Sequence, residues 1–295
     1  MVAVRWPDGN VTCPTCGHPS PRFLAARRVW QCGRAHPRRQ FSVKVGTIFE
    51  DSPLGLDKWL PAAWMLANCK NGISSYELGR AVGVTQKTGW FMLHRLREAM
   101  KTGSFAKMSG RVEADETFVG GLSKNMHRAK REQKIPANGP YGSKAIVMGF
   151  LNRGPKGKSR VRAGLITDTQ RVTLHAEIAQ RVEPGSEIFT DAWRAYRGLA
   201  PQFIHEFVDH ATEYVRGHVH TNGLENFWSL LKRAIKGTYV NVEPFHLHRY
   251  VDEQAFRFNE RTDGQGDGGR FVKTLRGTIG KRLTYDELRA VPASA

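Results

Sequence analysis

Residues 112–121 read Val-Glu-Ala-Asp-Glu-Thr-Phe-Val-Gly-Gly, and this stretch decides the fold class. Its β-favouring side chains and closing glycines predict a strand over residues 111–119 that runs into a turn. Further strands are expected at 145–152, 160–167, 187–190 and 203–209, and helices at 173–182, 222–235 and 244–259. Strands that alternate with helices predict an α/β domain over residues 111–260, in which helices flank a mixed sheet.

Three acidic residues of this domain are candidates for a metal site. Asp191 follows Asp115 by 76 residues, and Glu225 follows Asp191 by 34; the aspartates lie on strands and the glutamate on a helix. Two-metal phosphoryl transfer needs carboxylates from separate elements that converge on ions ~4 Å apart. The pattern therefore predicts catalysis with two Mg²⁺ ions, Mn²⁺ being the alternative ion. Chance spacing is the competing explanation, because the chain has other acidic residues: Glu113, Glu116, Asp168 and Asp209.

The helix expected at 222–235 carries several polar candidates. Glu225, Trp228 and Lys232 recur at i, i+3 and i+7, which places them on one helix face. Lys232 is therefore placed to hold a DNA phosphate, and Arg233 is a further candidate for DNA contact. Asn222 lies one turn before Glu225 and can assist the acidic residues.

A second metal site is expected near the N-terminus. Cys13 and Cys16 are separated by two residues, and Cys32 follows with His36 close behind. Such a pattern is typical of a zinc ribbon with four ligands around a structural Zn²⁺ ion. His36 is the expected fourth ligand, and His18 is the alternative. The alternative is that no metal binds and that the cysteines are buried free thiols.

Residues 73–90 predict two helices joined by a tight turn. Ser74 and Glu77 form a capping box, Gly83 permits the turn, and Thr85 can cap the second helix. The expected core consists of Tyr76, Leu78, Val82, Val84 and Trp90. The first turn of the second helix would then present Gln86, Lys87 and Thr88 to DNA, as in a helix-turn-helix. A helical hairpin that only packs is the alternative.

The remaining segments are a basic loop and a polar tail. Between residues 122 and 143 the chain carries candidates for phosphate contact: Lys124, Arg128, Lys130 and Arg131. A solvated loop without a partner is an equal alternative. The tail from Arg261 is rich in glycine and is expected to be irregular. We therefore expect a zinc ribbon at 1–50, a helix-turn-helix module at 54–108, the catalytic domain at 111–260 and a tail at 261–295.

The charge of the chain points to nucleic acid. Its 295 residues include 45 Lys and Arg against 27 Asp and Glu, which gives a net charge of +18. Such self-repulsion is tolerated more easily beside a polyanion, and each neutralised phosphate releases a counterion. Neither a signal peptide nor an apolar run of ~20 residues is seen. We expect a soluble cytoplasmic protein that associates with double-stranded DNA and not with membranes.

Several motifs occur together in a recognisable order. They are Cys-Pro-x-Cys-Gly from Cys13, Asp-Glu-Thr-Phe-Val-Gly-Gly from Asp115, Thr-Asp-x-x-x-x-Tyr from Thr190, and His-x-Asn-x-x-Glu-x-Phe-Trp-x-x-Leu-Lys-Arg from His220. Gly237-Thr-Tyr and His246-Leu-x-Arg-Tyr-x-x-Glu follow. Over about residues 10–260 the chain resembles the DDE transposases of bacterial insertion sequences, and within them the zinc-ribbon-bearing fifteen-ninety-five group.

The resemblance implies an RNase H-like catalytic domain, Mg²⁺ dependence, recognition of terminal inverted repeats and assembly of at least a dimer on paired transposon ends. Some relatives use Asn as the third residue of the triad, which leaves Asn222 and Glu225 as alternatives. We favour Glu225, since a carboxylate neutralises Mg²⁺ better than an amide. Two alternative functions remain. A DNA-binding regulator without catalysis would explain the charge and the first 100 residues but not the carboxylate motifs, and an RNase H-like nuclease would keep the fold but never join strands.

Overall fold

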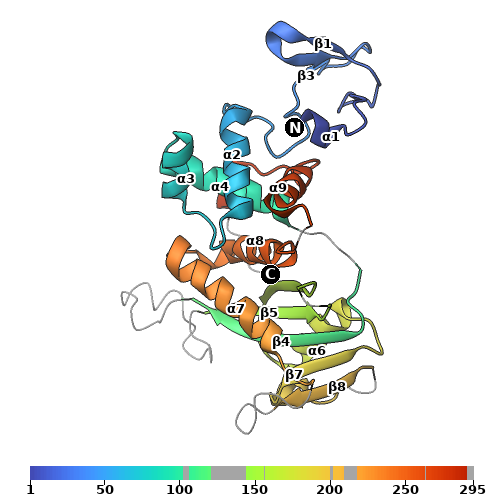
Figure 1. The fold of residues 1–295 in the computed structure, drawn as a ribbon, viewed down its shortest axis with the longest axis vertical. Helices are drawn as coiled ribbons and strands as arrows, with labels where there is room; N and C mark the ends of the chain where they lie inside the picture. Colours follow the sequence, from blue (N-terminus) through green and yellow to red (C-terminus); the bar gives the residue numbers. More distant parts are fainter. Residues whose placement is uncertain are drawn as a thin grey trace. The chain divides into compact units, whose positions relative to one another are not determined.

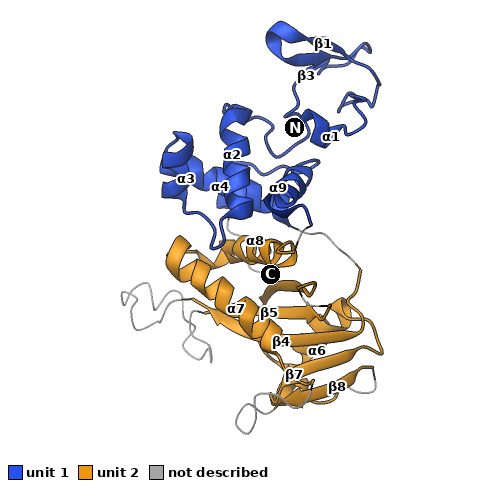
Figure 2. Cartoon of the chain, viewed as in Figure 1, with its two compact units in different colours: residues 1–101, 263–295 blue, residues 102–262 orange. Residues whose placement is uncertain are grey.

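The computed structural model describes residues 1–101, 106–120, 144–155, 157–199, 202–208, 218–262 and 264–290. They form two compact units (Figure 2). Unit 1 comprises residues 1–101 together with 263–295, and unit 2 comprises residues 102–262. The C-terminal segment thus belongs to the first unit. In the described parts of the chain, no helix has the length and apolar character needed to cross a bilayer.

A small antiparallel sheet lies near the start of unit 1 (Figure 1). Its strands, in spatial order, are β1 (Arg22–Leu24), β2 (Val29–Gln31) and β3 (Gln40–Phe41). The chain also forms a short helix, α1 (Val2–Arg5), and a 3-10 turn, η1 (Ala25–Arg27). The buried core of this region is made by Trp6, Cys13, Trp30, Cys32 and Phe41. So small an apolar core contributes little stability by itself.

Three helices follow, α2 (Leu56–Asn68), α3 (Ser75–Val82) and α4 (Gln86–Met100). The capping box predicted for α3 is present, because the Ser74 side chain accepts from the Glu77 N–H and the Glu77 carboxylate accepts from the Ser74 N–H. Gly83 ends α3 with a φ of 65°, in the left-handed region that glycine favours. Thr85 caps α4 through the Thr88 N–H, as predicted.

The predicted core between α3 and α4 was partly wrong. Leu78 and Val82 are buried and Val84 and Trp90 are half-buried, but Tyr76 is 67% exposed. Side chains two positions apart in an α-helix point in directions that differ by roughly 200° around the helix axis. Tyr76 therefore points away from the face that carries Leu78.

The C-terminal segment is helical, which corrects the expectation of an irregular tail. It contains α9 (Gly266–Arg276) and α10 (Tyr285–Arg289). In α9 the Phe271 ring packs against Trp64 of α2, with centroids 5.4 Å apart, and the Arg270 Nε donates to the Asn68 Oδ1 at 3.0 Å. These tertiary contacts override the low helix propensity of the glycines in α9.

A five-stranded mixed sheet forms the centre of unit 2. Its strands are β4 (Arg111–Val119), β5 (Ala145–Asn152), β6 (Arg160–Ile166), β7 (Glu187–Asp191) and β8 (Ile204–Val208). Their spatial order is β6-β5-β4-β7-β8. The β4 strand is antiparallel to β5 and parallel to β7, so the sheet changes from antiparallel to parallel at its central strand.

Helices flank both faces of this sheet, as predicted. On one face Leu174 and Ile178 of α6 (Arg171–Arg181) share a buried cluster with Ala114 and Phe150. On the other face α7 (Asn222–Ala234) and α8 (Leu247–Asn259) pack over Val147 and Leu151. Shorter turns complete the unit: η3 (Arg194–Tyr196), a π-helical turn η4 (Ile235–Tyr239) and η5 (Pro244–His246).

Close packing of α3 against α4 depends on the absence of a side chain at Gly89, which a substitution can test. A Cβ atom at Gly89 would lie 2.8 Å from the Ser75 carbonyl oxygen. We expect Gly89→Ala to lower the free energy of unfolding by about 1–3 kcal/mol, because backbone must move to admit the methyl group. Thermal unfolding measures the effect. Gly268→Ala in α9 is the control, since no atom lies within 4 Å of its added Cβ. Equal stability of Gly89→Ala and the native chain would contradict the packing.

Candidate active site and metal centre

Three cysteines and one histidine converge in the N-terminal ribbon. The ligand atoms of Cys13, Cys16, Cys32 and His36 all lie within 4.8 Å of one another. The Cys13 Sγ lies 3.4 Å from the His36 Nε2, and the Cys16 Sγ lies 3.6 Å from the Cys32 Sγ. Three thiols and one imidazole are the donors that a structural Zn²⁺ ion takes. The group includes His36 and not the alternative, His18.

Local backbone geometry brings the first two cysteines together. The Gly17 N–H donates to the Cys13 carbonyl oxygen at 2.8 Å, and the Cys13 N–H donates to the His18 carbonyl oxygen at 2.9 Å. Gly17 has a φ of 71°, a conformation that costs glycine little. The resulting tight turn points both thiols to one side, toward the cysteine and histidine that follow β2.

Neighbouring strands bring Asp115 and Asp191 close together in unit 2. The parallel register of β4 and β7 pairs Glu113 with Phe189, and the same offset puts Asp191 opposite Asp115. Backbone pairing between the two strands ends at Glu113 and Phe189, so both aspartates lie where the ladder stops. The Asp191 Oδ1 also accepts from the Trp193 N–H at 3.0 Å, which orders the turn after β7.

Helix α7, which carries Glu225, packs against Asp115. Trp228, one turn after Glu225, donates its indole N–H to the Asp115 Oδ2 at 2.9 Å. The β5 residue paired with Asp115 is Gly149, and a Cβ atom there would lie 2.6 Å from the Trp228 ring. The absence of a side chain at Gly149 therefore lets α7 pack close to β4. Glu225 is exposed, and its Oε1 accepts from the Thr221 hydroxyl at 3.4 Å.

The acidic residues influence one another electrostatically. The pKa of Asp115 is raised to about 6, chiefly by burial and also by the negative charges of Asp191 and Glu225. The hydrogen bond from Trp228 opposes this shift. The pKa of Glu116 is raised to about 7, again chiefly by burial and also by the two aspartates, while a hydrogen bond from Tyr196 lowers it. A site with this concentration of negative charge is suited to binding a divalent cation.

The three carboxylates are near one another without being gathered as tightly as the zinc ligands. Among the residues that the structure describes, the cysteine and histidine group is the only close cluster of three or more metal-ligating side chains. Like charges at short range repel, and a cation is needed to offset that repulsion. Asp115, Asp191 and Glu225 therefore fit the donor chemistry of Mg²⁺, which prefers carboxylate oxygens.

The other predicted residues fall into three groups. On α7, Asn222 and Arg233 are exposed and Lys232 is half-buried. On the first turn of α4, Gln86 and Lys87 are exposed and Thr88 is half-buried. The basic loop lies outside the described residues, and with it Lys124, Arg128, Lys130 and Arg131.

Sequence reasoning missed several residues around the carboxylates. Glu113 was taken only as a sign that acidic trios arise by chance, yet it is buried on β4 two residues before Asp115. The alternation of a strand was the available signal, because residues i and i+2 share a face. Immediately after Asp191 come three exposed side chains, which also received no role: Trp193, Arg194 and Arg197.

The zinc site predicts a clear difference between cysteines. We expect Cys32→Ser to lose its zinc and most of the folded structure of the ribbon, because metal binding supplies much of the folding energy of so small a domain. Metal analysis of the purified protein measures the zinc content. Cys69→Ser is the matched control, since Cys69 lies outside the ligand group. Retention of one zinc ion per chain by Cys32→Ser would contradict the assignment.

Comparison with known proteins finds matches over both regions that contain candidate sites. The chain matches the family model of the ISXO2-like transposase domain over residues 107–259 and that of the transposase zinc-ribbon domain over residues 1–36. It is 28% identical over 244 residues to an uncharacterized protein in transposable element ISH50 of Halobacterium salinarum, covering 79% of this chain and 80% of that protein. An uncharacterized transposase-like protein of Haemophilus influenzae is 31% identical over 103 residues, covering 35% of this chain and 83% of that protein.

These matches confirm the resemblance to insertion-sequence transposases that the motifs predicted. The first family model covers more than half of the chain and includes Asp115, Asp191 and Glu225. The second covers all four members of the cysteine and histidine group. The chain therefore belongs to the ISXO2-like transposase family and carries the zinc ribbon found with it.

Proposed function

We propose that this transposase binds the inverted repeats at transposon ends and catalyses Mg²⁺-dependent cleavage and strand transfer of DNA. The observation that supports the proposal best is the proximity of three carboxylates on separate elements. Asp115 and Asp191 lie at neighbouring strand positions, and α7 packs over them with Glu225, whose charge contributes to the raised pKa of Asp115.

In this proposal Asp115 and Asp191 hold the metal ions and Glu225 completes the ligand set. Bound Mg²⁺ ions would activate the attacking oxygen and stabilise the leaving oxygen. Water and then a DNA 3′-hydroxyl act as successive nucleophiles, so the chain needs no nucleophile of its own. The protein contributes by positioning and by neutralising charge. Lys232, one turn beyond Trp228 on α7, would hold a phosphate of the DNA.

Glu225 is favoured over Asn222 as the third ligand. Both residues belong to the first turn of α7 and both are exposed. Glu225 contributes to the raised pKa of Asp115, which indicates that its charge is felt at the site. Asn222 carries no charge and is proposed to assist from the start of the helix.

DNA binding is proposed to involve both units. In unit 1, α3 and α4 would act as a helix-turn-helix, with the exposed Gln86 and Lys87 on the first turn of the recognition helix. In unit 2, Trp193 and the exposed arginines after Asp191 supply an aromatic and basic surface next to the carboxylates. The net charge of +18 supports a polyanionic partner.

Two further parts of the proposal concern fold type and assembly. The strand order β6-β5-β4-β7-β8, antiparallel and then parallel, supports an RNase H-like type for the catalytic domain. By analogy with the family, at least two copies would assemble on paired transposon ends.

Removing one carboxylate tests the proposed chemistry. We expect Asp191→Asn to lower DNA cleavage by at least about a hundredfold, because metal-assisted stabilisation is worth several kcal/mol. Binding to inverted-repeat DNA should remain. Labelled transposon ends incubated with Mg²⁺ report cleavage, and a gel-shift assay reports binding. Asp168→Asn is the control, since Asp168 lies in the turn before α6 and should tolerate the change. Normal cleavage by Asp191→Asn would refute the metal site.

The same labelled ends separate the possible activities of the native chain. Joined products support transposition, whereas hydrolysis without joining supports a nuclease. Binding without any cleavage supports a regulator that lacks catalysis.

A further inference from the structure

Glu113 is a buried acidic residue to which the proposed chemistry assigns no role. It lies on β4 two residues before Asp115, so both side chains point to the face of the sheet that α7 covers. Only 1% of its side chain is exposed. A buried carboxylate is costly unless it is paired and hydrogen-bonded. The partners of Glu113 therefore indicate what it contributes.

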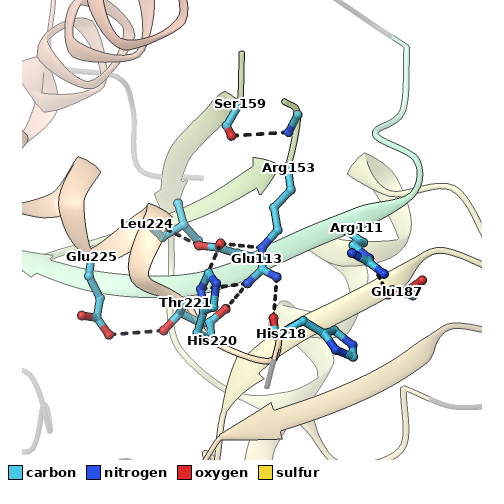
Figure 3. Close-up of polar contacts among 11 residues, drawn as sticks. Arg111, Glu113, Arg153, Ser159, Glu187, His218, His220, Thr221, Leu224 and Glu225 are labelled. Atoms are coloured by element: carbon cyan, nitrogen blue, oxygen red, sulfur yellow. Dashed lines mark hydrogen bonds and ion pairs between the residues drawn. The ribbon is translucent and has the colours of Figure 1, made fainter. Parts of the chain in front are cut away.

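One oxygen of Glu113 binds the start of α7. Its Oε2 accepts from the Leu224 N–H at 3.0 Å, and Leu224 directly precedes Glu225 (Figure 3). Thr221, the N-cap residue, makes no side-chain cap bond, and its hydroxyl donates to Glu225 instead. Glu113 thus caps the helix from the central strand, where a negative charge is favourable at the positive end of the helix dipole.

Gly223 makes this approach possible. A Cβ atom at that position would lie 2.8 Å from the Glu113 Oε2 and 2.8 Å from the Leu151 Cδ1. A larger residue at this position would force the Glu113 carboxylate or the Leu151 side chain to shift, and so would disturb the contact with α7. The glycine between Asn222 and Leu224 is therefore explained by the contact with the strand.

The other oxygen of Glu113 binds Arg153, which follows β5. The Arg153 Nε donates to the Glu113 Oε1 at 2.7 Å. The same guanidinium donates at 2.6 Å to the carbonyl oxygens of His218 and His220, in the segment that leads into α7 (Figure 3). The planar group of arginine suits this simultaneous contact, which lysine cannot reproduce.

We infer that Glu113 and Arg153 are positioning residues, which fix α7 along β4 and so hold Glu225 beside Asp115. The inference rests on the proposed function, in which those two carboxylates share metal ions. One residue along a helix corresponds to about 1.5 Å, whereas metal–ligand distances tolerate roughly 0.2 Å. The helix start must therefore be fixed tightly. Both oxygens of Glu113 already have partners from the protein, so it acts through α7.

Metal dependence of cleavage distinguishes positioning from general stability. We expect Glu113→Gln to raise the half-saturating Mg²⁺ concentration for cleavage of inverted-repeat DNA by about ten- to a hundredfold, the usual effect of losing a residue that orients metal ligands. Cleavage at saturating Mg²⁺ should recover in part. Gly223→Ala should raise the Mg²⁺ requirement as well, because its methyl group crowds the Glu113 carboxylate against the helix start without removing a charge.

Glu260→Gln is the matched control. Glu260 is 11% exposed and pairs with Arg160 of β6 at 3.4 Å, in the same unit. The Glu260→Gln substitution should lower the melting temperature, but the Mg²⁺ concentration required for cleavage should not change. If Glu260→Gln shifts that requirement as much as Glu113→Gln does, or if neither Glu113→Gln nor Gly223→Ala shifts it, the inference is overturned.

Hydrogen exchange of the full chain without DNA or Mg²⁺ gives a readout that does not depend on activity. We expect Glu113→Gln to speed amide exchange in residues 218–228 selectively, because the start of α7 loses its anchor. Unchanged exchange there would overturn the inference even if the native protein cleaves DNA. Conversely, failure of the native protein to cleave at any Mg²⁺ concentration would refute the proposed function, while selective exchange would still support the anchor. If Glu113→Gln does not fold, the same measurements on Gly223→Ala decide.

Discussion

The packing of α7 on the central strand β4 is the contact on which the arrangement of acidic residues depends. Gly149 leaves room for the Trp228 ring, and the Trp228 indole N–H then reaches Asp115. The apolar residues of α7 and α8 bury the same face of the sheet. Because Glu225 lies one turn before Trp228, its distance from the strands follows from this packing. Although β4 and α7 are far apart in sequence, the Trp228 ring and the space left at Gly149 allow them to pack together.

Negative charge is concentrated at this contact in a chain whose net charge is +18. Burial and mutual repulsion raise the pKa of Asp115 and of Glu116, so keeping both ionised destabilises the fold. Proteins tolerate such local cost chiefly at functional sites. The net positive charge of the chain attracts a polyanion from a distance, whereas the acidic centre repels a phosphate nearby.

Much of the fold was predictable from local pattern, because the strands and α7 obey strict periods and the caps at Ser74 and Thr85 are chemical signals. The cysteine spacing likewise predicted the cluster of three cysteines and one histidine. Other features depend on tertiary contact, which a sequence pattern does not carry. The helix α9 forms despite its glycines since it packs against α2, and Glu113 pairs with Arg153, 40 residues away. The catalytic roles of Asp115, Asp191 and Glu225 stay predictions.

The discontinuity of unit 1 has a consequence for synthesis of the chain. Ile48 and Gly46 bond to Thr278 and Gly280 through backbone groups, and α9 packs on α2. A ribosome therefore completes all of the sheet unit before it makes the last partner of the first helices. Domains fold as units during translation. A gene copy that a stop codon truncates after residue 262 would still encode every strand of the sheet, but its first unit would lack α9 and expose the apolar surface of α2.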